Sequence, residues 1–444
     1  MKTFAPAAVI LFVFGGTAVA KTPFPPPVVM ISIDGLPAED LNHARERGLH
    51  VDHLLALAAQ GVRAQAVKNV APTITYPNHT TIITGVLPTQ HMVLGNVRFD
   101  PEGKLSTANY WFADDIKVPT LWDAVHAAGG RVANIYWPVA VGSRSIDINF
   151  PEYWAGGQPK NLSLIAALSS TQMLPGADEP ARRDVLKLLI EPTTAGDQAR
   201  IDLALDIFAK EKPRLTTLHL VSLDETEHRE GPQSVAKADA LDALDRMIGA
   251  FVDRVRAIEP STRFIVVSDH GQEPSHNRVN LGVLLAKAGF ETPAAATGVE
   301  ASWRAAIWNV GSAYLLVKDP AVGAAALKTL QDYAAQPDSP IEKIVPMAQS
   351  IADRPDAQIA AIILFHPGFD SGAALTGDIV TPSQGRGQHG NSPDHPELRS
   401  VFIAAGPGIP TGQSLGVVDM RAIAPTVAKL LGVPMPSAPA HPLF

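Results

Sequence analysis

The stretch PVVMISID, from Pro27 to Asp34, carries the pattern that decides the fold: a run of apolar, largely β-branched residues that ends in a carboxylate. Such runs, apolar on both faces, are typical of strands buried in a parallel sheet. Four later stretches are strand-like in the same way: RVANIYW (Arg131 to Trp137), TTLHLVSLD (Thr216 to Asp224), RFIVVSDH (Arg263 to His270) and SVFIAAG (Ser400 to Gly406).

Helical stretches rich in Ala and Leu alternate with these strands. They are LNHARERGLHVDHLLALAAQG (Leu41 to Gly61), VPTLWDAVHAAGG (Val118 to Gly130), KADALDALDRMIGAFVDRVRAI (Lys237 to Ile258) and MRAIAPTVAKLLG (Met420 to Gly432). Several close with Gly, which is common just after a helix. The alternation predicts an α/β fold, with a mostly parallel sheet covered by helices on both faces.

The composition is that of a globular protein with ample core: 444 residues, 46% hydrophobic, 18% charged, with a formal net charge of -8. This mild acidity argues against an extended nucleic-acid surface, so binding of a phosphate group would need local positive charge such as metal ions. The chain has no Cys. Histidines and carboxylates are therefore the metal ligands that remain.

The N-terminus has the pattern of a secretory signal peptide. A Lys and an apolar run precede Ala18-Val19-Ala20, which fits an A-x-A cleavage site. The apolar run from Ala7 is short and interrupted by Gly15-Gly16, and no later stretch approaches the roughly 20 apolar residues that a membrane span needs. We therefore expect a signal peptide over residues 1–20 and a periplasmic or secreted protein over residues 21–444, without a membrane span.

Three strand-like stretches end in acidic residues: Asp34, Asp224, and Asp269 followed by His270. A single Asp after a strand most often caps a helix or closes a turn. In open α/β sheets, however, ligands bind outside the carboxyl ends of the strands, so three such residues together indicate a site. Asp224 and His228 are four residues apart and share a face if a helix starts there, where both can bind one cation.

Further ligands have to come from the remaining histidines. His389 lies in GRGQHGN, between glycines that permit close backbone approach. His79, His91, His276 and His395 are rival candidates. Spacing alone does not decide among them.

Motifs along nearly the whole mature sequence resemble one family. They are ISIDGL, TYPNHTTIITGVLPTQHMVLGN, VPTLWDAV, YWP, DETEHREGP, SDHGQ, QHGN and VDMRAIAPTVAKLLGVPMP. In this order they resemble the alkaline phosphatase superfamily and, within it, the type I phosphodiesterase / nucleotide pyrophosphatase family. The resemblance implies a three-layer α/β/α sandwich, and two zinc ions held by Asp34, Asp269 and His270 and by Asp224, His228 and His389. It also implies Thr75 as the nucleophile and Asn96 as the residue that holds a nonbridging phosphoryl oxygen.

The chemistry around Thr75 fits this assignment. Bound zinc can lower the pKa of a hydroxyl, and attack on phosphorus would give a phospho-threonine intermediate. Pro77 is placed to open a helix whose free N–H groups and dipole favour an anion. From the residues alone, Thr75 is equally well an ordinary N-cap, a part that Thr73, Thr80 or Thr81 could also play.

The substrate is expected to be a small phosphodiester or a nucleotide. In monoesterases of the same superfamily, a Lys and an Arg after the strand that here reads VANIYWPVA bind the extra phosphate charge. This chain has no cation at that place, although Arg144 lies close in sequence. The resemblance implies that Tyr76 stacks on a nucleotide base. The second stacking position corresponds to His219, which weakens a nucleotide-specific interpretation and leaves lipid head-group diesters open. A phosphomonoesterase, a phosphonoacetate-hydrolase-like enzyme and an inactive secreted binding protein are the alternatives.

Residues 273–387 separate two of the motifs and predict an inserted cap subdomain beside the metals. Its aromatic residues are candidates for shaping specificity, although bulky apolar residues are more often core: Trp303, Trp308, Tyr314, Phe365 and Phe369.

Overall fold

The structure is a computed structural model that describes residues 25–100, 109–154, 162–170, 180–292, 302–352, 354–383 and 385–444. The signal peptide expected over residues 1–20 lies outside these ranges. Within them, no helix combines the length and the apolar character needed to cross a membrane.

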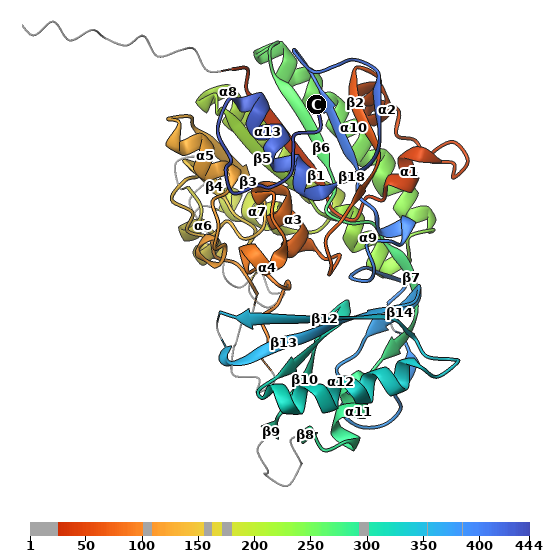
Figure 1. The fold of residues 1–444 in the computed structure, drawn as a ribbon. Coiled ribbons are helices and arrows are strands. Elements are labelled where there is room, and N and C mark those ends of the chain that lie inside the picture. Colours follow the sequence, from red (N-terminus) through yellow and green to blue (C-terminus); the bar gives the residue numbers. More distant parts are fainter. Residues whose placement is uncertain are drawn as a thin grey trace, which may run out of the picture.

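The centre of the molecule is an eight-stranded sheet in the order β18-β2-β17-β6-β1-β5-β3-β4 (Figure 1). Strand β1 pairs in parallel with β5 and β6, and β17 runs antiparallel to β6 and β2. The strands are β1 Val28–Ile33, β2 Gly61–Lys68, β3 Val132–Ile135, β4 Ile148–Phe150, β5 Leu215–Leu220, β6 Arg263–Val267, β17 Phe402–Ala405 and β18 Gln413–Asp419. The five expected strands are all present, and the sheet is mostly parallel as expected.

Helices cover both faces of this sheet, because alternate side chains of each strand point to opposite faces. Val29 and Ile31 of β1 pack with α2, α8 and α10, whereas Val28 and Met30 pack with α3, α5 and α13. The helices of these two layers are α2 Asp52–Ala59, α8 Thr194–Glu211 and α10 Val235–Ile258, and α3 Thr75–Thr84, α5 Leu121–Ala127 and α13 Ile423–Leu431. This is the three-layer α/β/α sandwich that the sequence predicts.

Shorter elements complete this part of the chain. They are α1 Ala38–Asn42, α4 Pro88–His91, η1 Ala113–Asp115, α6 Leu162–Leu168, α7 Pro180–Ile190, α9 Ser222–Glu230, η3 Pro396–Leu398 and η4 Met420–Ala422.

The stretch Leu41 to Gly61, expected to be helical, is not one helix. Helix α1 ends at Asn42, and Gly48 adopts a left-handed conformation with φ of 67°. Helix α2 begins afresh because the carboxylate of Asp245, on α10, accepts hydrogen bonds from the N–H groups of His53 and Leu54 at 2.9 and 2.8 Å. A cap supplied by a residue almost two hundred positions away leaves no signal in the local sequence.

After β6 the chain leaves the main sheet and builds an inserted cap subdomain (lower half of Figure 1). Its antiparallel sheet has the order β10-β11-β13-β12 and packs against α11 and α12. The elements are β7 Glu273–Val279, α11 Leu281–Lys287, β8 Glu291–Thr292, β9 Ser302–Trp303, β10 Ala305–Val310, β11 Ser312–Val317, α12 Pro320–Ala334, β12 Ile341–Ile351, β13 Arg354–Phe365, β14 Gly368–Ser371, β15 Val380–Pro382 and β16 Gly387–Gln388.

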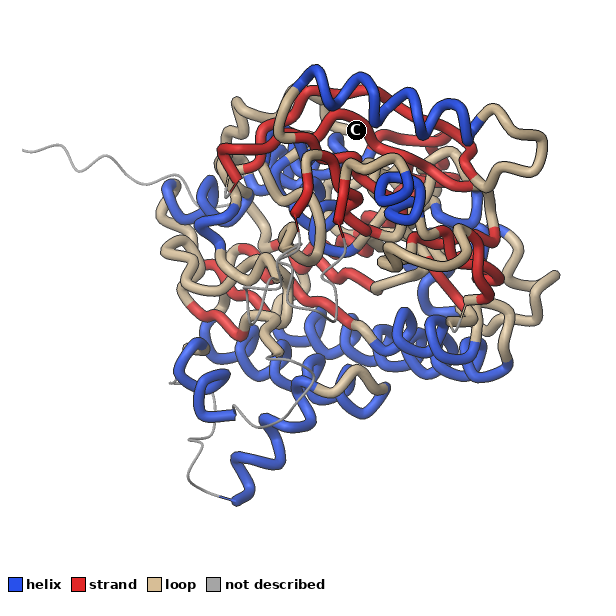
Figure 2. The backbone as a smooth tube through the Cα atoms, turned by 90° about the horizontal axis from the view of Figure 1, so that it is seen from below, coloured by secondary structure: helices blue, strands red, loops and turns tan. Residues whose placement is uncertain are grey.

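Four of the five cap aromatics are buried rather than presented to a substrate. Trp303, Trp308, Tyr314 and Phe365 belong to the core, and only Phe369 is partly exposed. Seen from the cap side, helical segments lie along the outer edges of the molecule with strands between them (Figure 2).

The insertion begins and ends side by side, because β16 pairs antiparallel with β7 and places Gln388 opposite Glu273. This pairing returns the chain to within reach of His270, which comes just before β7.

Candidate active site

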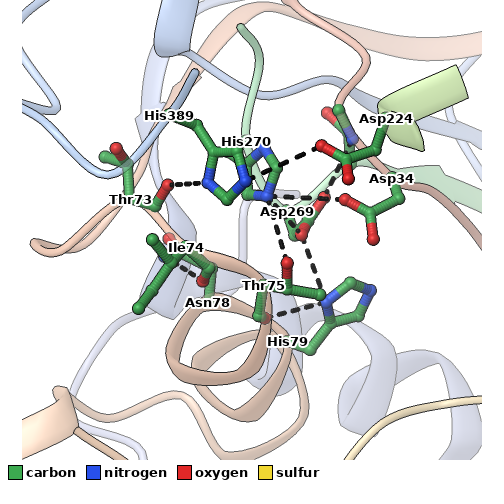
Figure 3. A network of polar contacts seen from close by, with 12 residues as sticks. Asp34, Thr73, Ile74, Thr75, Asn78, His79, Asp224, Asp269, His270 and His389 are labelled. Carbon is green, nitrogen blue, oxygen red and sulfur yellow. Dashed lines mark hydrogen bonds and ion pairs between the residues drawn. The ribbon is translucent and has the colours of Figure 1, made fainter. Parts of the chain in front are cut away.

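Three carboxylates converge at the carboxyl ends of the central parallel strands β6, β1 and β5. Asp34 directly follows β1 and Asp269 lies two residues after β6. Asp224 is in the first turn of α9, after β5, and not at the strand end itself. The six sequence-predicted ligands form two groups, Asp34, Asp269 and His270, and Asp224, His228 and His389, and within each group the ligand atoms lie within 4.8 Å of one another. Figure 3 labels all of them except His228.

The first group is fully buried. Nε2 of His270 lies 3.4 Å from Oδ1 of Asp34 and 3.1 Å from Oδ2 of Asp269. The other oxygen of Asp269, Oδ1, accepts a hydrogen bond from the backbone N–H of Gly35 at 3.3 Å. The three side chains therefore direct one atom each toward a common point.

The second group combines helix α9 with the loop after β16. As expected from their spacing, Asp224 and His228 lie on one face of α9, with Oδ2 and Nε2 3.4 Å apart. Nε2 of His389 lies 3.2 Å from Nε2 of His228. The rings of His389 and His270 stack with centroids 3.6 Å apart, so the two groups are neighbours.

The three histidines predicted to be ligands all direct the same nitrogen toward the site. Nδ1 of His228, His270 and His389 faces the carbonyl oxygens of Gly387, Gly271 and Thr73 at 3.0, 3.2 and 3.1 Å. A carbonyl oxygen only accepts, so each Nδ1 carries the proton, and each Nε2 presents a lone pair in the neutral ring. Metal-ligating histidines are oriented in this way.

These lone pairs and carboxylates fit divalent cations. The two Nε2 atoms of His228 and His389 are both acceptors and cannot bond each other, and Oδ1 of Asp34 and Oδ2 of Asp269 are buried without a hydrogen-bond partner. One cation bound by each group would satisfy these atoms. Nitrogen and carboxylate oxygen are ligands that zinc accepts in tetrahedral sites.

The electrostatics of the groups agree with this interpretation. Burial raises the pKa of Asp34 and Asp269 well above the ordinary range, and the neighbouring carboxylates add to the shift. Burial also lowers the pKa of His270 well below its ordinary value and that of His389 to about 4. His270 and His389 are thereby kept neutral, as ligands must be, and positive charge from a cation would offset the cost of the buried carboxylates.

Thr75 is the first residue of helix α3 and lies beside the first group. Its Oγ1 is 3.3 Å from Nε2 of His270 (Figure 3), and the residue is 8% exposed. The N-cap is Ile74, without a side-chain cap, so Thr75 is not itself an N-cap. The hydroxyls of Thr73 and Thr80 donate to backbone oxygens of Asn391 and Tyr76.

The expected free N–H groups at the start of this helix are largely engaged. The N–H of Tyr76 donates to Oδ1 of Asn96 at 2.9 Å, Pro77 has no N–H, and the N–H of Asn78 donates to the oxygen of Ile74. The side-chain oxygen of Asn96 is thus bonded to Tyr76, the residue after Thr75, and the amide nitrogen of Asn96 remains as a hydrogen-bond donor. The cap supports this loop, since Nε1 of Trp308 donates to the oxygen of Val97 at 3.1 Å.

Tyr76 is 2% exposed, and its hydroxyl donates to Oε1 of Glu152 at 2.9 Å. A base can stack on this ring only if neighbouring side chains move, so that role stays a prediction. The aromatic cluster beside Tyr76 comes from Trp111, Tyr153 and Trp154. The sequence interpretation did not single out these three, and the second stacking position that it assigned, His219, is buried.

The rival residues have other surroundings. His91 is buried against Thr81, His276 is exposed, and His395 lies between Glu273 and Glu342. His79 lies behind the first group, with Nδ1 2.9 Å from the oxygen of Thr75 and 3.4 Å from Oδ2 of Asp269. Arg144 is exposed and lines a surface hollow with Asp123 and Ser145 that contains none of the six ligands.

Gln272 completes the surroundings of Asp224, because its Nε2 donates to Oδ1 of Asp224 at 2.6 Å. The motif SDHGQ contains this residue, but only the fold shows what it contacts.

The mostly parallel sandwich, its inserted cap and the ligand groups at the strand ends define an alkaline-phosphatase-like fold. Residues 28–390 match the family described as Type I phosphodiesterase / nucleotide pyrophosphatase, and the chain belongs to that family.

Two curated relatives and one solved structure illustrate the likeness. An uncharacterized pyrophosphatase/phosphodiesterase of Schizosaccharomyces pombe is 28% identical over 63% of this chain and 52% of its own length. Human ectonucleotide pyrophosphatase/phosphodiesterase family member 1 is 26% identical over 56% of this chain and 24% of its own length. The chain thus matches about half or less of these relatives. The structure of an inactive Thr-to-Ala variant of murine ectonucleotide pyrophosphatase/phosphodiesterase 5, in complex with AMP, superposes with a TM-score of 0.65 at 18% identity, covering 94% of this chain and 96% of that chain. At that identity the likeness concerns the fold.

Proposed function

We propose that the protein is an exported phosphodiesterase / nucleotide pyrophosphatase that holds two zinc ions and hydrolyses phosphodiester or pyrophosphate bonds through a phospho-threonine intermediate. The observation that carries this proposal is the position of Thr75. Its hydroxyl points at His270, where two groups of three metal-binding side chains meet.

Each residue has a role that follows from its position. The oxygen of Thr75 forms a bond to phosphorus as the bond to the leaving oxygen breaks, and water then releases the phosphoryl product from Thr75. Asn96, fixed by its bond to Tyr76, offers its amide nitrogen to a nonbridging phosphoryl oxygen. Zinc held by Asp34, Asp269 and His270 and by Asp224, His228 and His389 would supply the positive charge that favours both displacements.

A diester or pyrophosphate substrate is favoured over a monoester. Among the described residues, no Lys or Arg forms an ion pair with the six ligands. A phosphodiester carries one negative charge less than the fully ionised monoester and needs less compensation. The AMP complex of the murine relative supports a nucleotide as one part of the substrate.

The remaining assignments belong to the same proposal. Tyr76 contributes to substrate binding together with Asn96. Residues 273–387 are the cap, residues 21–444 the catalytic unit, and residues 1–20 direct the chain to the periplasm or outside the cell.

Hydrolysis of a chromogenic nucleotide phosphodiester, a simple diester and the matching monoester by purified protein tests this function. The measurement is made before and after a chelator, and again after zinc is restored. We expect a preference for diesters that the chelator abolishes and zinc restores. Preference for the monoester would support the phosphomonoesterase alternative, and no hydrolysis of any of them would favour the phosphonate-hydrolase or binding-protein alternatives.

A further inference from the structure

His219 is a buried histidine of β5 that lies against the ligand Asp34 without belonging to either ligand group. It is 0% exposed, and its Nε2 lies 3.1 Å from Oδ2 of Asp34. Strands β1 and β5 are parallel neighbours in which Ser32 pairs with His219, so the side chain reaches the residue that follows β1.

The two oxygens of Asp34 are divided between two partners. Oδ2 faces His219, whereas Oδ1 faces Nε2 of His270 and has no hydrogen bond of its own. A carboxylate held by one oxygen in this way cannot rotate freely about its last bond. The other oxygen is then presented in a fixed direction to a cation in the first group.

The other ring nitrogen of His219, Nδ1, is also in contact with polar groups. Nδ1 lies 3.1 Å from the carbonyl oxygen of Tyr136 and 3.4 Å from Oε2 of Glu152. The ring of His79 packs against it with centroids 4.3 Å apart, and the ring of Tyr136 stacks at 6.4 Å. An ionised Asp34 oxygen only accepts, so the contact at Nε2 of His219 is a hydrogen bond in which the ring nitrogen carries the proton and donates. The Tyr136 oxygen also only accepts, so a ring that donates from Nδ1 as well carries protons on both nitrogens.

We propose that His219 is a positioning residue that holds the Asp34 carboxylate in the orientation required for metal binding by Asp34, Asp269 and His270. This inference rests on the proposed function, because it presumes that these three residues hold zinc. When a residue that hydrogen-bonds to a metal ligand is substituted, metal affinity commonly falls by about 10- to 100-fold.

Two substitutions separate a directed contact from general packing. In His219→Gln the amide nitrogen occupies roughly the place of Nε2 and can still donate to Asp34. In His219→Asn the amide nitrogen lies near the place of Nδ1, so the bond to the Tyr136 oxygen can form and the bond to Asp34 cannot. His91→Gln is the matched control, since His91 is equally buried but contacts Thr81 and Val93 instead of a ligand.

Zinc affinity is measured by titrating the metal-free full chain against a competing chelator, with thermal unfolding of the metal-free forms as the test of folding. We expect two zinc ions in the wild type, the His219→Gln variant and the His91→Gln variant. In His219→Asn, one of the two should bind about 10- to 100-fold more weakly and the other should be unchanged.

Three results would overturn the inference, and they are distinguishable. If the wild type binds two zinc ions and the His219→Asn variant binds both as tightly, the inference alone fails. If the folded wild type binds fewer than two, the proposed function fails and the inference with it. Weakening in both His219 variants together with lower unfolding temperatures would assign His219 to packing, and would also overturn it.

Discussion

At the scale of single residues, the account depends most on the hydroxyl of Thr75. Thr75→Ala removes the oxygen that we propose attacks phosphorus, so we expect turnover of a nucleotide diester to fall by at least about 10³-fold. Because Thr75 is not one of the six ligands, zinc content and unfolding temperature should stay near those of the wild type. Steady-state kinetics with metal analysis of the same preparations checks this.

Thr75→Ser is the matched control, since it keeps a hydroxyl at the same place and loses only a methyl group. It should retain a measurable share of the wild-type turnover. Near-normal turnover in the Ala variant would contradict the assignment of Thr75 as the nucleophile.

At this scale the three aspartates of the candidate site could be predicted from the residues themselves, whereas the choice of His389 and of Thr75 came only through the family resemblance. Asp34, Asp224 and Asp269 stand out because they follow buried strands, whereas His389 could not be separated from His91 or His395 by spacing. The contacts of His219 and His79 could not be predicted. They depend on which strands are neighbours and on how deep each ring is buried.

At the scale of elements, the hairpin between β10 and β11 supports the loop that carries His389. Gly311 has φ of 81°, and a Cβ at this position would come within 2.3 Å of the carbonyl oxygen of His389. Gly311→Ala should therefore displace that loop, lower the free energy of unfolding by about 1–3 kcal/mol and weaken zinc binding by Asp224, His228 and His389. Thermal unfolding and zinc titration check both effects.

Gly377→Ala is a suitable control, because Gly377 has φ of 89° but open space where its Cβ would stand. This variant should lose only about 1–2 kcal/mol in free energy of unfolding, because Ala is unfavourable in a left-handed backbone conformation. Its zinc binding should be normal. Equal zinc affinity in the Gly311 and Gly377 variants would show that the hairpin does not support the metal site.

The elements themselves were predictable where their pattern is strong. The five apolar strands and the helix ending at Ile258 agree with the sequence pattern. In strand β2, GVRAQAVK, polar residues alternate with apolar ones, and strand β18 is largely exposed. Neither strand therefore has the continuous apolar run that marks a central strand. Both are strands in the structure because neighbouring strands of the sheet are their hydrogen-bonding partners.

At the scale of the whole molecule, His395 connects the cap to the loop that carries His389. Its ring nitrogens lie 2.7 Å from Glu273 of β7 and 2.6 Å from Glu342 of β12. Burial lowers the pKa of His395, but the two carboxylates more than offset this, and the net pKa is raised. The stabilisation is therefore complete below the unfolded-state pKa of about 6.5 and is lost as the pH rises through the higher folded-state value.

His395→Gln should accordingly lower the unfolding temperature most near about pH 6, with the difference from the wild type shrinking as the pH rises. A chelator is included, because zinc binding is itself pH-dependent. His276→Gln, on the exposed side of β7, is the control. A difference that does not change with pH would show that His395 contributes packing only.

The stereochemical course at phosphorus tests the central claim most directly. A nucleotide diester made chiral at phosphorus with sulfur is hydrolysed in isotopically labelled water, and the configuration of the product is determined. Each in-line displacement inverts phosphorus, so attack by Thr75 followed by attack of water predicts overall retention. Overall inversion would mean that water attacks the substrate directly, and would contradict a phospho-threonine intermediate.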